Sequence, residues 1–352
     1  SRKLITGIHT YYIEDLFKDY HQHFILIYGH ETKNRLGKNY FFIKEGYLRF
    51  LLKVEIFISS NICDKFIKGS KRVYLNHHLY DSPLVSFEKE QKLCERLSLY
   101  DIIFLSSQDL IQLYNEMFNR YNSSPKIKLP VLKEIGYPKF DFLQKKIKNI
   151  SKNQENNVLI VPTNIDGFPK FSLINNLKEL IDELFSKTDL NIIFRPHPSD
   201  RHKPKILQIK NFFETNSKFS YDISDDYSLV YSKSMCLLTD ISDAAYMFAF
   251  LTMRPVVFFS NQNLDNFINA KEGKIKLYNY CNLKYFINRE KIGIIINQDT
   301  STSEKISKLR YELKKYELSI SKLKKDIKYL GQSMERFDDE IKDLIYTKQK
   351  FN

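Results

Sequence analysis

The stretch NIIFRPHP, residues 191–198, joins a short apolar run to a cluster of polar and charge-bearing residues. A second stretch, LLTDISDAAYMFAFLTMRPVVFF at residues 237–259, has the same form. Each predicts a buried strand that stops abruptly, and open α/β sheets present ligand-binding groups at the carboxyl ends of such strands. The sequence therefore predicts functional groups directly after Phe194 and directly after Leu238.

Short apolar runs recur along the chain with amphipathic stretches between them. Those in the first half are HFILIY (23–28), VEIFIS (54–59), KRVYL (71–75) and DIIFL (101–105). After the polar stretch KKIKNISKNQENN, a second series begins with VLIV (158–161) and ends near GIII (293–296). Strands separated by helical segments indicate parallel βαβ units. We therefore expect an α/β protein of GT-B type, with Rossmann-like domains at 1–145 and 146–300 that face a cleft holding the active site.

The last part of the chain, residues 301–352, has a different pattern. Apolar residues recur at three- and four-residue spacing from Ile306 to Leu344, with Lys, Glu, Asp and Ser between them. Apolar positions kept in phase over this length are typical of a coiled-coil helix, which would make a homo-oligomer or bind a partner. The alternative is two amphipathic helices that fold back on the globular body, with Gly331 at the turn. Either form makes the segment a scaffold rather than a catalyst.

The composition limits the class of partner. Lys and Arg number 55 against 42 Asp and Glu, and the formal net charge of +13 suits an anionic partner, although a Lys-rich genomic bias would give the same charge. No zinc-finger, helix-turn-helix or RNP-like motif supports nucleic-acid binding. Cys63, Cys94, Cys236 and Cys281 lack CxxC spacing, so we expect neither a disulfide framework nor a structural zinc. No apolar run is long enough to span a membrane, which predicts a soluble or peripheral protein.

Arg195 and His197 are the first candidate site residues. Pro196 and Pro198 fix the backbone on both sides of His197, just past a strand. A histidine presented in this way can donate a hydrogen bond to a phosphate oxygen or transfer a proton, and Arg195 can add a bidentate phosphate contact. A lone histidine can also be structural, but the strand-end position favours contact with a phosphate-bearing ligand.

Other candidates lie at further strand ends in the second half. Ser242 or Asp243 is placed as the N-cap of an apolar helix, where free backbone N–H groups bind phosphate, although both residues would cap that helix in any case. Ser224 lies in the acidic loop YDISDDY, which can bind a metal or ribose hydroxyls but is more often a solvated turn. Thr163 ends the first strand of the second half, and Asp240 follows the strand before Ser242. We expect these residues to contact the same ligand.

In the first half, the block NHHLYDSP follows the KRVYL strand and places His77 and His78 at its carboxyl end. An acceptor hydroxyl needs a base whose pKa lies near neutrality, and histidine supplies one. Adjacent residues at a strand end point in opposite directions, so one of the two faces the substrate, and the sequence leaves open which. No metal is expected, because no third ligand stands at a recognisable spacing.

In several blocks the chain resembles the CDP-glycerol glycerophosphotransferase family, whose members build teichoic-acid and related capsule phosphopolymers. The matching blocks are NHHLYDSP, YDIIFLSSQ, LKEIGYPKFDFL, VLIVPT, FRPHP and LLTDISDAAYMFAFLTMRPVVFF. The resemblance implies an acceptor domain, a second domain that binds a cytidine-nucleotide-activated donor, and no cofactor. It also implies that His77 or His78 is the base for the acceptor hydroxyl and that His197 and Ser242 contact the donor phosphates.

We therefore expect a transferase that moves glycerol phosphate or a related polyol phosphate from a CDP-activated donor to a hydroxyl of a cell-surface polymer or its lipid-linked precursor. We expect it in the cytoplasm, peripheral to the inner face of the cell membrane. One alternative is a GT-B glycosyltransferase that uses CMP-Kdo or another nucleotide sugar in capsule or O-antigen synthesis, with Asp240, Asp243 or Asp166 acting at the anomeric carbon. Another is a coiled-coil assembly factor that retains an inactive transferase fold.

Overall fold

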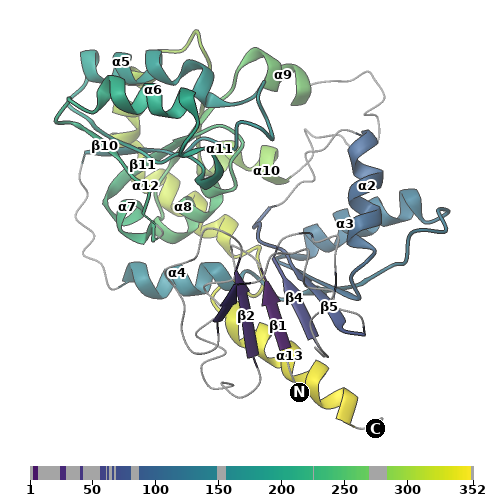
Figure 1. The fold of residues 1–352 in the computed structure, drawn as a ribbon. Coiled ribbons are helices and arrows are strands. Elements are labelled where there is room, and N and C mark those ends of the chain that lie inside the picture. Colours follow the sequence, from purple (N-terminus) through teal and green to yellow (C-terminus); the bar gives the residue numbers. More distant parts are fainter. Residues whose placement is uncertain are drawn as a thin grey trace. The chain divides into compact units, whose positions relative to one another are not determined.

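The computed structural model describes residues 3–6, 24–28, 40–42, 56–60, 62, 66, 69–80, 87–148, 156–224, 226–268 and 284–349. The chain divides into two compact units (Figure 1). Unit 1 comprises Ser1–Phe142 and Ile327–Asn352, and unit 2 comprises Leu143–Asp326. Cys63 and Cys281 lie outside the described residues.

A seven-stranded sheet forms the centre of unit 1, with the strand order β3-β2-β1-β4-β5-β6-β7. All of its paired strands are parallel. The strands are β1 (Lys3–Thr6), β2 (Phe24–Tyr28), β3 (Tyr40–Phe42), β4 (Ile56–Ser59), β5 (Lys71–Leu75), β6 (Ile102–Leu105) and β7 (Val131–Glu134). The described helices are α2 (Phe87–Leu97), α3 (Gln108–Tyr121), α13 (Ser333–Gln349) and the first part of α4 (Pro138–Lys148). The strand order is that of a Rossmann fold with an added edge strand.

Unit 2 contains a six-stranded parallel sheet in the Rossmann order β10-β9-β8-β11-β12-β13. Its strands are β8 (Asn157–Ile160), β9 (Asn191–Phe194), β10 (Phe219–Tyr221), β11 (Ser234–Thr239), β12 (Val256–Phe259) and β13 (Gly293–Ile296). Its described helices, after the last part of α4, are η5 (Leu173–Asn176), α5 (Leu177–Lys187), η6 (Pro198–Asp200), α6 (Pro204–Phe213), α7 (Ser228–Lys233), α8 (Ala244–Thr252), α9 (Gln262–Ile268), α10 (Lys284–Ile287), α11 (Arg289–Ile292) and α12 (Thr302–Lys324).

The apolar runs predicted as strands are strands in the structure. NIIF forms β9 and GIII forms β13 with the predicted bounds, and the strand predicted to stop after Leu238 is β11, which ends at Thr239. Every side chain of β8, β11 and β12 is buried. Helices lie on both faces of this sheet (Figure 1), which is why its central strands are apolar throughout rather than alternating.

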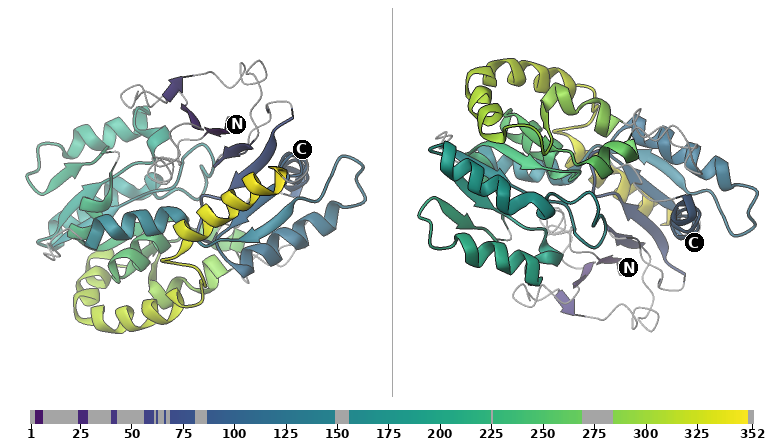
Figure 2. Two further views of the ribbon diagram at one scale, coloured as in Figure 1. Left: turned by 90° about the horizontal axis from the view of Figure 1, so that it is seen from below. Right: turned by 90° about the horizontal axis from the view of Figure 1, so that it is seen from above.

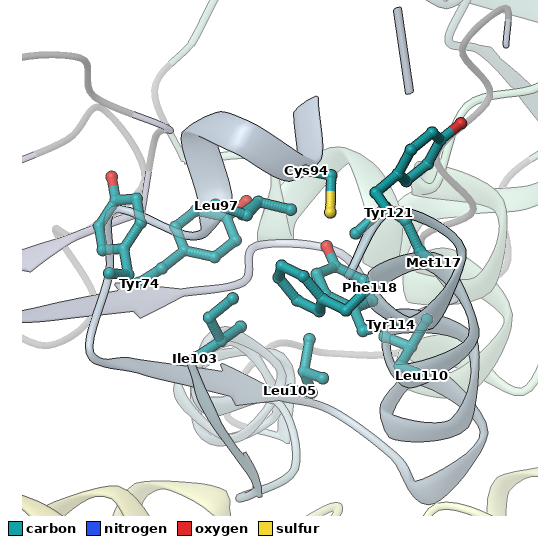
Figure 3. Packing of buried hydrophobic residues seen from close by; sticks show 11 residues of the cluster. Tyr74, Cys94, Leu97, Ile103, Leu105, Leu110, Tyr114, Met117, Phe118 and Tyr121 are labelled. Carbon is teal, nitrogen blue, oxygen red and sulfur yellow. The ribbon is translucent and has the colours of Figure 1, made fainter. Parts of the chain in front are cut away.

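A core cluster in unit 1 fills the space between β5, β6 and the helices α2 and α3 (Figure 3). Its buried members are Tyr74, Cys94, Leu97, Tyr100, Ile103, Leu105, Leu110, Tyr114, Met117, Phe118 and Tyr121. Burial raises the pKa of the Cys94 thiol to about 12, so this cysteine is protonated and unreactive at neutral pH. The cluster fixes the end of β5, from which the two adjacent histidines follow.

The expected coiled coil over residues 306–344 is wrong. The segment forms two separate helices, of which α12 packs in unit 2 and α13 lies against the sheet of unit 1 (Figure 2). Phe337 and Ile341 of α13 are buried in the unit 1 core, where the Phe337 ring meets Phe104 edge to face at 5.8 Å. Gly331, with φ +99°, lies between the helices, as the alternative prediction proposed. The spacing does not distinguish the two arrangements, because apolar residues recur every three or four positions in any helix that packs one face on a globular body.

Candidate functional site

His77 follows the carboxyl end of β5, and the backbone after a neighbouring strand holds its ring. The ring nitrogen Nδ1 lies 2.6 Å from the carbonyl oxygen of Ser60, which directly follows β4. A carbonyl oxygen only accepts, so Nδ1 carries the proton and donates it. In the neutral ring Nε2 then bears the lone pair, which is the state that a general base needs.

His78 stands beside His77 but is held in a different way. Its backbone N–H donates to Oδ1 of Asn76 at 2.7 Å, and Asn76 donates Nδ2 to the hydroxyl of Tyr114 at 3.2 Å. The two histidine rings lie 4.0 Å apart between centroids, with their planes at 39°. These contacts orient the His77 ring through a ring nitrogen and the His78 residue through its backbone.

Tyr137 is a further residue of this site, and the sequence did not assign it. Its side chain is almost fully buried, and its hydroxyl donates to the backbone carbonyl of His77. Its own N–H donates to Oγ of Ser333, at the start of α13, at 2.7 Å. The signal in the sequence is the Gly-Tyr-Pro block, but a block of adjacent residues does not reveal partners elsewhere in the chain.

In unit 2, His197 caps the short helix η6 after β9. The backbone N–H of Ser199 donates to Nδ1 at 3.3 Å, and the Ser199 hydroxyl lies 2.7 Å from the same nitrogen. Because a backbone N–H only donates, Nδ1 is an acceptor and the neutral ring carries its proton on Nε2. His197 therefore offers a hydrogen-bond donor at the ring position where His77 offers a lone pair.

A buried carboxylate anchors the turn that holds His197. Asp200 is 1% exposed and accepts from the N–H of Ile165 at 2.9 Å and from Nδ2 of Asn164 at 3.1 Å. It also pairs with Lys203 at 2.6 Å. Asn164 and Ile165 follow β8, while Asp200 follows β9, so the contacts tie two neighbouring strand ends together.

Arg195 and Ser224, both predicted at the ligand, contact each other. Arg195 donates Nη2 to the Ser224 carbonyl at 2.7 Å and Nη1 to the Ser224 hydroxyl at 3.2 Å. It also pairs with Asp222 and lies over the ring of Tyr227, 5.2 Å from its centroid. These contacts hold the loop after β10, so Arg195 contributes a fixed positive charge at the strand end while its Nη groups bond within the protein.

Asp240 is fully buried, and backbone N–H groups surround its carboxylate. Oδ1 accepts from Thr163 at 2.9 Å and from Ile241 at 2.7 Å, and Oδ2 accepts from Leu173 at 2.8 Å. Burial raises the pKa of this carboxyl to about 6, although the N–H hydrogen bonds act in the opposite direction. The structure thus brings Asp240 and Thr163 together and directs the carboxylate into the protein, where it fixes the Thr163 backbone.

Ser242 and Asp243 lie at the amino end of α8, as predicted. Ser242 accepts the N–H of Ala244 on Oγ at 3.3 Å. Its carbonyl accepts from the hydroxyl of Tyr285 at 3.0 Å, and the hydroxyl of Tyr246 donates to the Tyr285 carbonyl. These two tyrosines, which the sequence did not assign, hold the turn that begins α8, and free N–H groups at a helix start are suited to an anion.

The strand order places the unit 2 candidates at one edge of the sheet. Thr163, His197 and Ser242 follow β8, β9 and β11, which are neighbours in the order β9-β8-β11, and Ser224 follows β10 beside β9. Parallel strands end at the same edge, where ligands of open α/β sheets bind. This edge offers backbone N–H groups, one imidazole N–H and a guanidinium charge, a set suited to phosphate. Within the described part of the chain, no group of three His, Cys, Asp or Glu side chains is placed to hold a metal.

A family model described as CDP-Glycerol:Poly(glycerophosphate) glycerophosphotransferase matches residues 6–320. The chain is similar to the structure of the wall teichoic acid polymerase TagF, with TM-score 0.65 and 17% identity over 99% of this chain and 89% of that chain. It is also similar to the UDP-GlcNAc 2-epimerase of Methanocaldococcus jannaschii in complex with UDP-GlcNAc and UDP, with TM-score 0.60 and 13% identity over 98% of this chain and 99% of that chain. No curated protein sequence matches the chain. At these identities the structural likenesses confirm the GT-B type fold alone.

Proposed function

The chain belongs to the CDP-glycerol:poly(glycerophosphate) glycerophosphotransferase family, and we propose that two of its histidines have different roles in glycerol-phosphate transfer. His77 acts on the acceptor and His197 acts on the donor. The protein moves glycerol phosphate from a CDP-activated donor to a hydroxyl of a cell-surface polymer. In the proposed step the acceptor hydroxyl oxygen attacks the β-phosphorus of CDP-glycerol. A new phosphodiester bond forms as the bond to the bridging oxygen breaks, and CMP leaves with the electron pair.

His77 is the proposed general base. Its Nε2 takes the proton of the acceptor hydroxyl, and the ring becomes an imidazolium whose Nδ1–H still donates to the Ser60 carbonyl. A carbonyl oxygen stabilises this cation without competing for the proton. His78, whose backbone N–H donates to Asn76, is assigned to acceptor binding beside the base.

On the donor side, His197 is the proposed donor to a pyrophosphate oxygen. Its Nε2–H forms a hydrogen bond that strengthens as charge develops on the departing CMP. Ser242 and Asp243 place the amino end of α8 at the same phosphates, and Arg195 adds positive charge. Thr163 contributes its hydroxyl from the end of the neighbouring strand.

The observation that carries this assignment is that Nδ1 of the two rings has opposite partners, a carbonyl acceptor at His77 and a backbone N–H donor at His197. His77 is fixed with the lone pair on Nε2 by a carbonyl acceptor, and His197 is fixed with the proton on Nε2 by a backbone N–H donor. A base needs the first state and a donor to phosphate needs the second.

The test replaces each histidine of the pair with asparagine, whose amide can stand in for one ring nitrogen. His77→Asn keeps an amide donor for the Ser60 carbonyl and removes the base, so kcat should fall by roughly 10²- to 10⁴-fold with little change in KM for CDP-glycerol. His78→Asn is the matched control and should retain most of kcat. The measurement is CMP release and phosphodiester formation on a glycerophosphate-primed acceptor. Full activity in His77→Asn, or an equal loss in both variants, would overturn the assignment of the base.

His197 has its own pair of variants. Gln places an amide N–H near the position of Nε2, whereas Ala leaves no donor, so His197→Gln should retain more activity than His197→Ala. Calorimetric titration with CDP-glycerol checks whether the lost interaction belongs to donor binding. Equal activity of the Gln and Ala variants would contradict a donor role for Nε2–H.

We also propose that the protein associates peripherally with the inner face of the cell membrane through the outer face of α12. Tyr311 is 91% exposed and Leu318 is 67% exposed, and they alternate along this face with the exposed side chains of Lys308, Lys315 and Lys322. Among the described helices none is long and apolar enough to cross a bilayer. Lysines near an anionic surface contribute about 1 kcal/mol each, and a tyrosine ring suits the headgroup region. This face fits an anionic bilayer that holds a lipid-linked acceptor.

Vesicle co-sedimentation tests the membrane proposal. The double variant Tyr311→Ser, Leu318→Ser should bind phosphatidylglycerol vesicles several-fold more weakly than the unchanged protein, which in turn should not bind phosphatidylcholine vesicles. Leu229→Ser is the control, because Leu229 is also half exposed but lies on α7. Unchanged binding by the double variant would move the membrane contact elsewhere.

A further inference from the structure

We infer that Tyr137 is a positioning residue for the base His77, and that α13 takes part in catalysis by holding Tyr137. This inference rests on the proposed role of His77. It follows from a chain of hydrogen bonds that joins three segments of unit 1, from Ser333 to Tyr137 and from Tyr137 to His77. The sequence assigned the carboxy-terminal segment to assembly, and nothing in that expectation linked it to the reaction.

Tyr137 fixes the backbone of the base. Its hydroxyl donates to the carbonyl oxygen of His77 itself, while the His77 ring donates Nδ1–H to the Ser60 carbonyl. One contact sets the peptide plane after His77 and the other sets the ring. Together they determine where Nε2 points, which matters because a displacement of about 1 Å in a reacting group can cost about 10²-fold in rate.

The start of α13 in turn fixes Tyr137. Ser333 is fully buried, accepts the Tyr137 N–H on Oγ at 2.7 Å and donates the same hydroxyl to the Tyr329 carbonyl at 2.7 Å. The Asp141 carboxylate accepts the N–H groups of Gly331 at 2.8 Å and Met334 at 3.1 Å. The turn before α13 is therefore anchored at two points to the segment that carries Tyr137.

The turn before α13 packs so closely on the segment that carries Tyr137 that it restricts the residue at position 136. Gly136 has φ +77°, and a Cβ at this position would collide with Ser333 Oγ and lie 2.8 Å from the Tyr329 carbonyl oxygen. A glycine is therefore needed directly before Tyr137 for the turn to reach it. The close packing holds Tyr137 in place, so that its hydroxyl bonds to His77 and its N–H bonds to Ser333.

A buried tyrosine can also stabilise a fold without affecting a reaction, so the test separates the two roles. Tyr137→Phe removes only the hydroxyl, and kcat should fall about tenfold while KM for CDP-glycerol stays within about twofold. Tyr121→Phe is the matched control, because Tyr121 is a buried tyrosine of the same unit that packs in the α2–α3 cluster. The control should keep kcat even where its melting temperature falls as far as that of Tyr137→Phe.

Two further readouts report on His77 without relying on rate. Nitrogen-15 NMR of the imidazole should show the Nδ1–H tautomer in the unchanged protein and in Tyr121→Phe, and a mixture of tautomers in Tyr137→Phe. Ser333→Ala should lower kcat less than Tyr137→Phe, and the double variant should lose no more than Tyr137→Phe alone, because Ser333 acts through Tyr137.

The outcomes separate this inference from the proposed function. If His77→Asn is inactive but Tyr137→Phe keeps kcat and the Nδ1–H tautomer, the base assignment stands and the positioning role is wrong. If His77→Asn is fully active, the base assignment itself is wrong. Independent, additive losses in Ser333→Ala and Tyr137→Phe would show that α13 does not act through the tyrosine.

Discussion

At the scale of residues, Asp240 makes the stability of unit 2 depend on pH. Burial raises the pKa of its carboxyl to about 6, against about 3.9 in an unfolded chain. Between these values the folded state binds more protons than the unfolded state, so this group lowers the free energy of unfolding as pH rises from about 4 to about 6. Above that range its contribution is constant.

Asp240→Asn removes this titration. The amide also places an N–H₂ donor against one of the backbone N–H groups that the carboxylate accepts, so the variant should be less stable at every pH. The stability advantage of the unchanged protein should be larger at pH 4.5 than at pH 7, by roughly 2 kcal/mol. Urea unfolding of both proteins at these two pH values measures the difference. A constant difference would mean that the carboxyl keeps its ordinary pKa.

The candidate residues show what a sequence reveals at this scale. His197 and Ser242 were predictable because a rigid Pro-His-Pro turn and a helix start after buried strands can be read from adjacent residues. Asp240 was predicted at the ligand, yet its partners are N–H groups of Thr163 and Leu173, and no local pattern records a backbone donor from a distant loop. Tyr137 was missed for the same reason.

At the scale of elements, buried strands were predictable and the carboxy-terminal helices were only half predictable. Short apolar runs such as those of β8, β11 and β12 are buried throughout, because helices cover both faces of a parallel sheet and leave its central strands in the interior. The spacing in α12 and α13 fixes their helical form and their apolar faces. It does not say whether that face meets a second chain or the same chain, because both partners demand the same period.

Alanine substitution at two glycines of unit 1 allows the free-energy cost of backbone strain to be measured separately from the cost of steric collision. Both Gly136 and Gly331 have positive φ. A Cβ added at Gly136 would collide with neighbouring atoms, whereas a Cβ added at Gly331 would have no other atom within 4 Å. Gly331→Ala should therefore cost about 1 kcal/mol from the left-handed backbone alone. Gly136→Ala should cost about 1 to 3 kcal/mol more, because the buried turn before α13 must move. Chemical unfolding measures both, and equal costs would contradict the close approach.

At the scale of the whole molecule, the chain leaves unit 1, builds unit 2 and returns to unit 1. The returning helix supplies Phe337 and Ile341 to the core beside Phe104, and Glu340 pairs there with Lys133 of β7. Unit 1 is thus built from both ends of the chain, so α13 is part of its core.

Phe337→Ala should destabilise unit 1 by about 3 to 5 kcal/mol, because it removes a fully buried ring from the core. Limited proteolysis with mass spectrometry should find the new cleavage sites in unit 1, while unit 2 keeps its resistance. Phe212→Ala on α6 is the control, since that ring is 53% exposed and its loss should change little. Cleavage that begins in unit 2 would contradict this account of where α13 belongs.

During synthesis of this chain, unit 2 is completed before unit 1, although unit 1 is begun first. All of unit 2 has been synthesised by Asp326, but unit 1 still lacks Ser333 and Phe337 at that point. Domains generally fold as units during synthesis, so the middle of the chain should fold before its beginning is complete. On the proposed mechanism, a nascent chain acquires its donor-binding edge first and can hold the nucleotide before it can activate an acceptor. Transfer begins only once α13 has been made.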